Sequence, residues 1–309
     1  MMDTKLIGLL FLLLFGTACS KDPVVQQGDK DKNDFYGWTA GKVIKDAEGW
    51  TEVVIGDYPL VLSVPHGGGI KPEHIPDRTC TGSTTVLDTW TIEMARAIQQ
   101  EFKQKLNKTP FVVISHLSRK KIDQNRTLDK ALCTDKTLEP TWYFYHNYLD
   151  SLLRYSSEKY GKTLFIDLHA HGHTKQRLEL GYNLSTTQLD YLSKGWDLSK
   201  IGAASSYANL LQMNPAVDIQ GALIGDHAFG TLMQEKGFPS VPSRQDPVPA
   251  AGDAYFTGGD NTQLAASDKY PKVYGFQIES NSGSRNTEER RAEFAKRLVE
   301  SVEVMVVKF

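Results

Sequence analysis

Cysteine and net charge are both scarce in this sequence of 309 residues, and each scarcity excludes a class of protein. Three cysteines are too few for a small scaffold that depends on disulfides. The 35 basic and 37 acidic side chains give a net charge of −2, so no basic surface favours nucleic acid as the main partner. With 40% hydrophobic and 23% charged residues, the chain has the ordinary composition of a globular protein with a large core.

The N-terminal segment has the pattern of an export signal. Lys5 precedes an apolar run over residues 6–15, which suits the hydrophobic part of a signal peptide and is too short to span a bilayer comfortably. Small residues then lead to Cys19, which resembles a bacterial lipoprotein signal, although Gly16 stands where an aliphatic residue is usual. An ordinary secretory peptide with a coincidental cysteine is the alternative. The pattern predicts a signal peptide over residues 1–18 and a lipid on Cys19.

That lipid would anchor the protein in a membrane. Ser20-Lys21-Asp22 resembles a short signal that sends some bacterial lipoproteins to the cell surface. The polar residues that follow predict a flexible tether over residues 19–34. No second linker divides the rest, which predicts one domain over residues 35–309. We therefore expect a lipoprotein of the outer membrane or the cell surface.

The two remaining cysteines, Cys80 and Cys133, lie in stretches that read as loops. In an oxidising compartment they would form a disulfide, and two buried free thiols are the alternative. Neither has the spacing of a metal site.

Short apolar runs alternate with helical patterns along the predicted domain. Nearly continuous apolar runs are typical of strands that are covered on both faces of a sheet. Apolar residues that recur at spacings of three and four predict helices, and Asn286 with Glu289 resembles a capping box at the start of the last one. The order predicts an α/β fold with a central, mostly parallel (mixed) sheet flanked by helices. The predicted strands are residues 61–64, 111–115, 163–168 and 273–278, and the predicted helices are 88–106, 141–160 and 286–308.

Each predicted strand leads directly into a cluster of polar residues. In open α/β sheets, ligands bind in the crevice outside the carboxyl ends of the strands. Four such clusters therefore predict one convergent site. They are Pro65-His66-Gly67-Gly68-Gly69; His116 with Ser118-Arg119, Asp123, Asn125 and Arg126; Asp167-Leu168-His169-Ala170-His171-Gly172; and Glu279-Ser280-Asn281.

The histidines of these clusters are candidates for metal ligands. Side chains alternate along a strand, so Asp167, His169 and His171 share one face, and histidines at the end of a buried strand are good ligands for zinc. Core histidines bonded to Asp167 are the alternative. His66 precedes three glycines, which let backbone approach closely, and no Lys-Ser/Thr pair follows, which excludes a phosphate-binding loop. A turn that faces a substrate or a metal explains this pattern better.

Charged residues at the other strand ends could bind or activate a substrate. Arg126, beside Asn125, could hold a carboxylate through its two-pronged guanidinium group. Glu279 ends a buried strand, where burial raises the pKa of a carboxyl group toward the range of a useful general base. It could instead be a metal ligand or an ordinary partner of Arg285.

In their order along the chain, six short motifs resemble the N-formylglutamate amidohydrolase family. The resemblance covers roughly residues 50–305. It implies a fold similar to that of the zinc carboxypeptidases, with a central mixed sheet and one catalytic zinc ion. The motifs are Pro65-His66-Gly67-Gly68; Ser118-Arg119; Asp123-x-Asn125-Arg126; Asp167-Leu168-His169-x-His171-Gly172; Phe256-x-Gly258-Gly259; and Gln277-Ile278-Glu279.

The resemblance implies a role for each matched residue. His66 and His169 would be zinc ligands, and Glu279 would be the base that activates water. Arg119 would be a second contact for an anion or an oxyanion. The residues implied for substrate binding are Asn125 and Arg126, as the clamp for a carboxylate, and Phe256, Thr257, Gly258 and Gly259, as the lining of the pocket.

The third zinc ligand is the point at which this sequence departs from the pattern. Zinc carboxypeptidases use His-x-x-Glu, but Gly69 stands where that glutamate should be. Asp88, which opens the following predicted helix, is the favoured replacement, and Glu73 is the other candidate. His171 would then be a substrate contact, a support for the ligands or a replacement ligand.

These assignments predict a zinc-dependent hydrolase that cleaves an amide in a substrate with a free carboxylate. The substrate would be a small molecule or a peptide: an N-acyl amino acid, a peptide or a compound derived from peptidoglycan. A lipoprotein outside the inner membrane is badly placed for formylglutamate made in the cytoplasm. A metal-free binding lipoprotein, and an esterase or deacylase on the same zinc site, are the alternatives.

Overall fold

The computed structural model describes residues 37–309. The predicted signal peptide, Cys19 and the tether over residues 19–34 lie outside the described residues. Within residues 37–309, no helix combines the length and the apolar composition that crossing a membrane requires.

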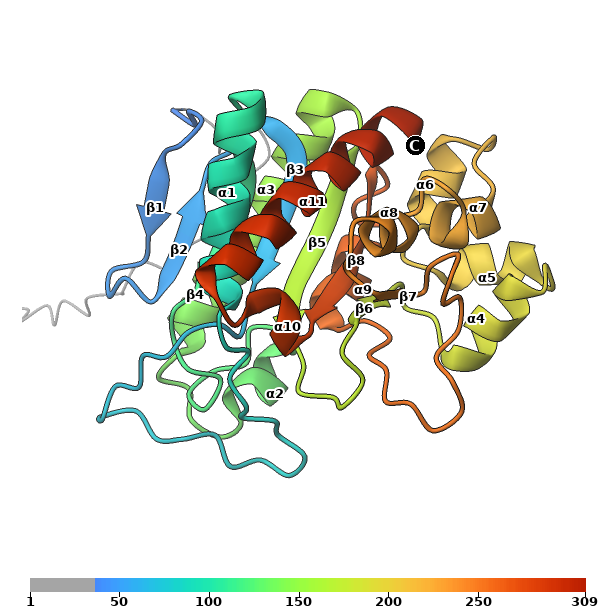
Figure 1. Cartoon of the computed structure of the whole chain (residues 1–309). Coiled ribbons are helices and arrows are strands. Elements are labelled where there is room, and N and C mark those ends of the chain that lie inside the picture. Colours follow the sequence, from blue (N-terminus) through green and yellow to red (C-terminus); the bar gives the residue numbers. More distant parts are fainter. Residues whose placement is uncertain (1–36) are drawn as a thin grey trace, which may run out of the picture. The chain divides into compact units, whose positions relative to one another are not determined.

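In this part of the chain, eight strands form one mixed sheet with the order β1-β2-β4-β3-β5-β8-β6-β7 (Figure 1). The central strands β4, β3, β5 and β8 are parallel to one another, whereas β2 and β6 run antiparallel to their neighbours β4 and β8. The predicted α/β fold with a mostly parallel sheet is confirmed, and the four predicted strands are the four central ones. The strands are β1 (Val43–Lys45), β2 (Thr51–Val54), β3 (Tyr58–Val64), β4 (Pro110–Ser115), β5 (Thr163–Ala170), β6 (Leu178–Gly181), β7 (Ser240–Val241) and β8 (Val273–Ser280).

Helices cover both faces of this sheet. Figure 1 shows α1 (Thr91–Leu106) and α11 (Glu288–Lys308) side by side on one face, with α3 (Glu139–Tyr160) behind the other. The shorter helices are α2 (Leu128–Leu132), α4 (Thr186–Ser193), α5 (Leu198–Ala204), α6 (Ala208–Met213), α7 (Ile219–Ile224), α8 (Phe229–Glu235), α9 (Asp260–Ala265) and α10 (Ser282–Arg285).

The starts of the two longest helices differ from the predicted ones. α3 begins two residues earlier than expected, at Glu139. The prediction of a capping box at Asn286 and Glu289 is wrong. The N-cap of α11 is Thr287, whose hydroxyl accepts a hydrogen bond from the N–H of Arg290 at 3.2 Å. Asn286 instead ends the short helix α10.

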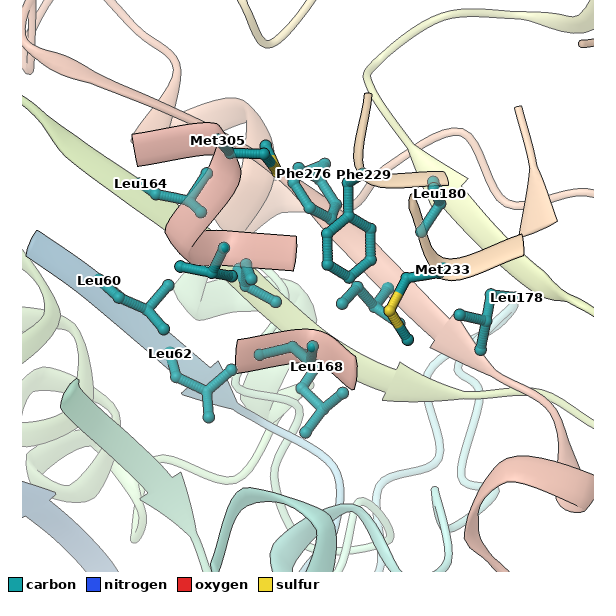
Figure 2. Close-up of a cluster of buried hydrophobic side chains, with 14 of the residues drawn as sticks. Leu60, Leu62, Leu164, Leu168, Leu178, Leu180, Phe229, Met233, Phe276 and Met305 are labelled. Atoms are coloured by element: carbon teal, nitrogen blue, oxygen red, sulfur yellow. The ribbon is translucent and has the colours of Figure 1, made fainter. Parts of the chain in front are cut away.

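Alternate side chains of the central strands have different surroundings, because successive residues of a strand point to opposite faces. On one face, Leu60, Leu62 and Leu168 pack with residues of β8, α8 and α11 in the main apolar cluster that Figure 2 shows. On the other face, Phe165 packs in a second apolar cluster with residues of α3. Towards the carboxyl ends this second face becomes polar, and Asp167 on β5 is a fully buried carboxylate there.

Cys80 and Cys133 form a disulfide, with their Cα atoms 5.4 Å apart. Of the two alternatives for these cysteines, the structure contains the disulfide. It joins the loop between β3 and α1 to the end of α2, two segments that are far apart in the sequence.

Candidate active site

A cavity of about 450 Å³ lies at the carboxyl ends of the central strands. A larger cavity of about 650 Å³, beside α5, α6 and α7, has no histidine, lysine or arginine in its lining, so we place the site in the first. The predicted residues that line it are His66, Asp88, Arg119, Asn125, Arg126, His169, Phe256, Gly258, Gly259 and Glu279. Ala170 and Gln277, which belong to two of the predicted motifs, line it as well, and the remaining lining residues are Thr84, Lys130 and Asp260.

Three buried side chains converge on one point in this cavity. Nδ1 of His66 lies 3.1 Å from Nδ1 of His169, and Oδ2 of Asp88 lies 3.0 Å from the latter and 3.6 Å from the former. Asp88 was predicted to open the helix, but α1 begins only at Thr91. Asp88 precedes it in a turn, in which the Asp88 carbonyl accepts hydrogen bonds from Thr91. Glu73, the other candidate for a third ligand, is exposed in the loop between β3 and α1. The structure therefore groups Asp88 with the two histidines.

Each histidine is also hydrogen-bonded to a carboxylate through its other ring nitrogen. Nε2 of His66 donates a hydrogen bond to Asp123 at 2.6 Å, and Nε2 of His169 donates one to Asp167 at 3.0 Å. An ionised carboxylate only accepts hydrogen bonds, so each Nε2 carries its proton and each Nδ1 presents a lone pair. Ser63 donates to the other oxygen of Asp167 at 2.7 Å. Proteins use this arrangement to orient histidines that bind a metal.

The three donor atoms fit a zinc ion. Two imidazole lone pairs and one carboxylate oxygen repel one another at separations of 3.0–3.6 Å unless a cation or a shared proton lies among them. Tetrahedral zinc with bonds of about 2.0–2.1 Å holds its ligands about 3.3 Å apart, which matches these separations. Two histidines and one carboxylate also form a ligand set of catalytic zinc sites, which keep a fourth position open.

The charges of this cluster shift the pKa values of its members. Burial alone would raise the pKa of Asp88, but hydrogen bonds and the charges of His169 and His66 outweigh it and lower this pKa. Burial alone would lower the pKa of His169, but Asp167 and Asp88 raise it well above its ordinary value. Without a metal, protons therefore occupy the place of the cation, and zinc binding should release them.

Glu279 lies beside the cluster, on β8, in register with His169 on β5. Burial raises the pKa of Glu279 to about 8, with the charge of His169 opposing this shift and those of Asp88 and Glu179 adding to it. Its Oε1 accepts a hydrogen bond from Gln277 at 2.7 Å, while its Oε2 has no partner among residues 37–309. A buried carboxyl group with an unpaired oxygen and a raised pKa is suited to exchange a proton with a reacting group.

The two predicted arginines both reach the cavity, and each has an acidic partner. Nε of Arg119 donates to Asp123 at 2.9 Å, which leaves its two terminal nitrogen atoms without a partner in the described part of the chain. Nη1 of Arg126 donates to the carbonyl of Asn125 at 2.6 Å and lies 3.6 Å from Oδ1 of Asp260. Asp260 therefore balances part of the charge of Arg126, a feature that no motif predicted.

Asn125 lines the cavity, and its side chain is buried. Its Oδ1 accepts a hydrogen bond from the N–H of Asn261 at 2.8 Å, and its Nδ2 lies 3.1 Å from Nε2 of His169. Gly259 packs so closely against this amide that a Cβ atom there would collide with it. Asn125 thus supports the floor of the cavity, and its direct contact with a substrate carboxylate stays a prediction.

The glycines after His66 allow a close approach of backbone, as expected, but to the protein itself. A Cβ atom on Gly68 would collide with the backbone of His116, at the end of β4. Gly68 therefore lets the two strand ends meet, which fixes the turn that carries His66.

His171 lies outside the cavity. β5 ends at Ala170, so the alternation that would place His171 on the face of His169 stops there. Nε2 of His171 donates to the carbonyl of Arg177 at 2.9 Å, and Nδ1 accepts from the N–H of His173 at 3.1 Å. Both ring nitrogens are therefore occupied by backbone groups.

Three cavity-lining residues were not predicted from the sequence. Thr84 comes from the loop before α1, Lys130 from α2 and Asp260 from the start of α9. None of them follows a central strand or belongs to a periodic pattern. Only the folded structure brings them to the site.

Comparison with known proteins gives structural matches of low sequence identity. No family model and no curated protein matches the sequence. An N-formylglutamate amidohydrolase is among the solved structures that match. This enzyme of Ralstonia eutropha JMP134 has 12% identity and a TM-score of 0.48, and the match covers 80% of this chain and 93% of that one.

Two further solved structures match. A gene product of Agrobacterium tumefaciens has 12% identity and a TM-score of 0.49, covering 83% of this chain and 94% of its own. The N-acetylmuramyl-L-alanine amidase of Mycobacterium abscessus has 16% identity and a TM-score of 0.37, covering 80% of this chain and 98% of its own. At these identities, the chemistry has to follow from the residues of this chain's own site.

Proposed function

We propose that this chain is a zinc-dependent hydrolase that cleaves an amide bond in a substrate with a free carboxylate. One observation carries the proposal: a single cavity holds the converging ligand atoms of His66, Asp88 and His169 beside the buried, half-unpaired Glu279. These three residues would hold the zinc ion, and Asp123 would keep His66 in the ligating tautomer. When bound, zinc lowers the pKa of water toward about 7 and polarises a carbonyl group.

Glu279 would transfer the proton in both halves of the reaction. Its ionised carboxylate accepts the proton of the attacking water at the unpaired Oε2, and the same group then returns the proton to the leaving amine. Both transfers need a pKa near the working pH. Burial supplies that condition, because it raises the pKa of Glu279 to about 8.

The arginines would bind the charges that the substrate carries or develops. The unpaired terminal nitrogens of Arg119 can donate hydrogen bonds to the carbonyl oxygen as it becomes negative. Arg126, partly exposed at the edge of the cavity, can exchange Asp260 for a substrate carboxylate. A volume of about 450 Å³ suits an N-acyl amino acid, the end of a peptide or a peptidoglycan-derived amide.

Arg126→Ala should raise KM for substrates with a free carboxylate by roughly 10- to 100-fold, the usual weight of a hydrogen bond to a charged group. KM for the matched substrates whose carboxylate is amidated should change little. The assay is a panel of N-acyl amino acids, short peptides and muropeptides, each with its ester analogue, alongside elemental analysis of the protein. If the zinc-loaded wild type cleaves only the esters, the protein is an esterase and not an amidase. A protein that binds substrates without any metal would be a binding lipoprotein.

We also propose that Cys19 carries a lipid that anchors the mature protein in the outer membrane or at the cell surface. The support is the short apolar run that ends in Gly16-Thr17-Ala18-Cys19. Cys19→Ala should move the protein from the membrane fraction to the soluble fraction, whereas Ser20→Ala should leave it in the membrane. Unchanged membrane association of Cys19→Ala would contradict the anchor.

A further inference from the structure

One buried arginine joins three segments of the cavity wall that are far apart in the sequence. Nη1 of Arg78 donates hydrogen bonds to the carbonyl oxygens of Thr84 at 3.1 Å and Arg119 at 2.9 Å, and its Nη2 donates to that of Lys130 at 3.0 Å. All three acceptor residues line the cavity. A guanidinium group donates from a rigid planar fork, so Arg78 fixes these three backbones relative to one another.

The disulfide joins two of these segments, the loop between β3 and α1 and the helix α2. Cys80 follows Arg78 by two residues and Cys133 follows Lys130 by three, and the bond between them closes the loop against α2. The N–H of Cys80 also donates to Sγ of Cys133 at 3.3 Å. Lys130 is thus held at the cavity by two separate cross-links.

Lys130 is an exposed lysine in the lining of the cavity, and it has no counter-ion among the described residues. In the part of the chain that the structure describes, its Nζ makes no ion pair, and the adjacent Asp129 pairs with Lys136 instead. The other two cations of the lining are partly balanced, Arg119 by Asp123 and Arg126 by Asp260. Of the three cations in the lining, Lys130 is therefore the one without an acidic partner among the described residues.

Arg78 also contributes to the electrostatics of the proposed metal centre. Its Nη1 lies 3.7 Å from Oδ2 of Asp123, the carboxylate that holds His66. Arg78 and Arg119 therefore both place positive charge beside this carboxylate.

We propose that Lys130 binds a carboxylate group of the substrate and that Arg78 is the positioning residue that brings Lys130 and Arg119 to the cavity. The proposal rests on the proposed function in that it takes the ligand to be the substrate. It adds a second carboxylate contact to that of Arg126, on a different segment of the wall.

Succinate, a dicarboxylate that contains no amide bond, is the probe, and calorimetric titration of the purified full chain measures its Kd. Lys130→Met and Arg78→Met should each raise Kd by roughly 10- to 100-fold. Arg78→Lys should bind as weakly as Arg78→Met, because an ammonium group cannot span the three carbonyl oxygens. The matched controls are Lys136→Met, an exposed lysine outside the cavity, and Arg177→Met, an equally buried arginine whose ion pairs with Asp246 and Asp253 lie outside it.

Lys130 is exposed, so its variant should fold even where an Arg78 variant does not. Wild-type affinity in Lys130→Met, or an equal loss in Lys136→Met, overturns the carboxylate contact. Wild-type affinity in Arg78→Lys, or an equal loss in Arg177→Met, overturns the positioning role.

Succinate binding needs no turnover, which separates this inference from the proposed function. A wild type that binds succinate through Lys130 but cleaves no amide keeps the contact and refutes the hydrolase. A wild type that cleaves carboxylate-bearing amides with a KM that Lys130→Met leaves unchanged keeps the hydrolase and refutes the contact.

Discussion

Glu279→Gln should keep the fold and the zinc and should lower kcat by about 10²–10⁴-fold, the usual contribution of general acid–base catalysis. Glutamine has nearly the shape of glutamate, and its carbonyl oxygen can still accept the hydrogen bond that Gln277 donates to Glu279. It cannot take the proton of the attacking water. Steady-state kinetics on the best substrate of the panel, with elemental analysis of the same samples, measures both parts of the expectation.

Glu52→Gln is the matched control for this variant. Glu52 is also buried, on β2, but it does not line the cavity. Hydrogen bonds from His116 and Arg96 outweigh its burial and lower the pKa of Glu52 to about 2. Its loss should cost stability and leave kcat unchanged. Full activity in Glu279→Gln would exclude this residue as the base and favour a route that depends on the metal alone.

The two glutamates also give opposite dependences of stability on pH. In the metal-free protein the folded pKa of Glu279, about 8, exceeds its ordinary value of 4.5, so the contribution of Glu279 to the free energy of unfolding is lost as the pH rises from about 4.5 to 8. For Glu52 the folded pKa is about 2, so its contribution is present above about pH 4.5 and is lost as the pH falls toward 2. Urea unfolding of metal-free samples should therefore show that the free energy of unfolding decreases less between pH 5 and pH 8 in Glu279→Gln than in the wild type.

The centre of the sheet could be predicted from the sequence because its strands are covered on both faces. β3, β4, β5 and β8 carry nearly continuous apolar runs, and these four strands are neighbours in the sheet. The outer strands gave no such signal. β1 has exposed residues in the pattern Val43-Ile44-Lys45, and β6 carries the buried Glu179 in the short segment Leu178–Gly181.

The core of the candidate site was predictable because it follows the central strands. His66, His169 and Glu279 stand at the ends of β3, β5 and β8, and the parallel order of these strands places them at one edge. Asp88 lies in a loop without periodicity, so the sequence left it in competition with Glu73. The sequence could not show that β5 ends at Ala170, and this end is the reason that His171 leaves the site.

His66→Ala and His169→Ala should each abolish stoichiometric zinc binding and hydrolysis. Each change removes one of three ligand atoms, and two remaining ligands hold zinc poorly. Each also leaves a buried carboxylate, Asp123 or Asp167, without its imidazole partner. His116→Ala is the matched control, because that histidine is bonded to Glu52 outside the cavity and should be dispensable for zinc. Elemental analysis and competition with a chelating dye measure the affinity.

The same zinc-affinity measurement on Asp88→Ala and Glu73→Ala identifies the third ligand. Asp88→Ala should weaken zinc binding strongly, because its Oδ2 is the carboxylate oxygen that meets both imidazole rings, whereas Glu73→Ala should matter little. Asp123→Asn should have an intermediate effect and weaken the zinc affinity by about 10- to 100-fold, because it removes the charge that holds the His66 ring but removes no ligand. Zinc lost in Glu73→Ala and kept in Asp88→Ala would show that the ligand assignment is wrong. Zinc retained in both histidine variants would place the metal elsewhere and remove the basis of the proposed hydrolysis.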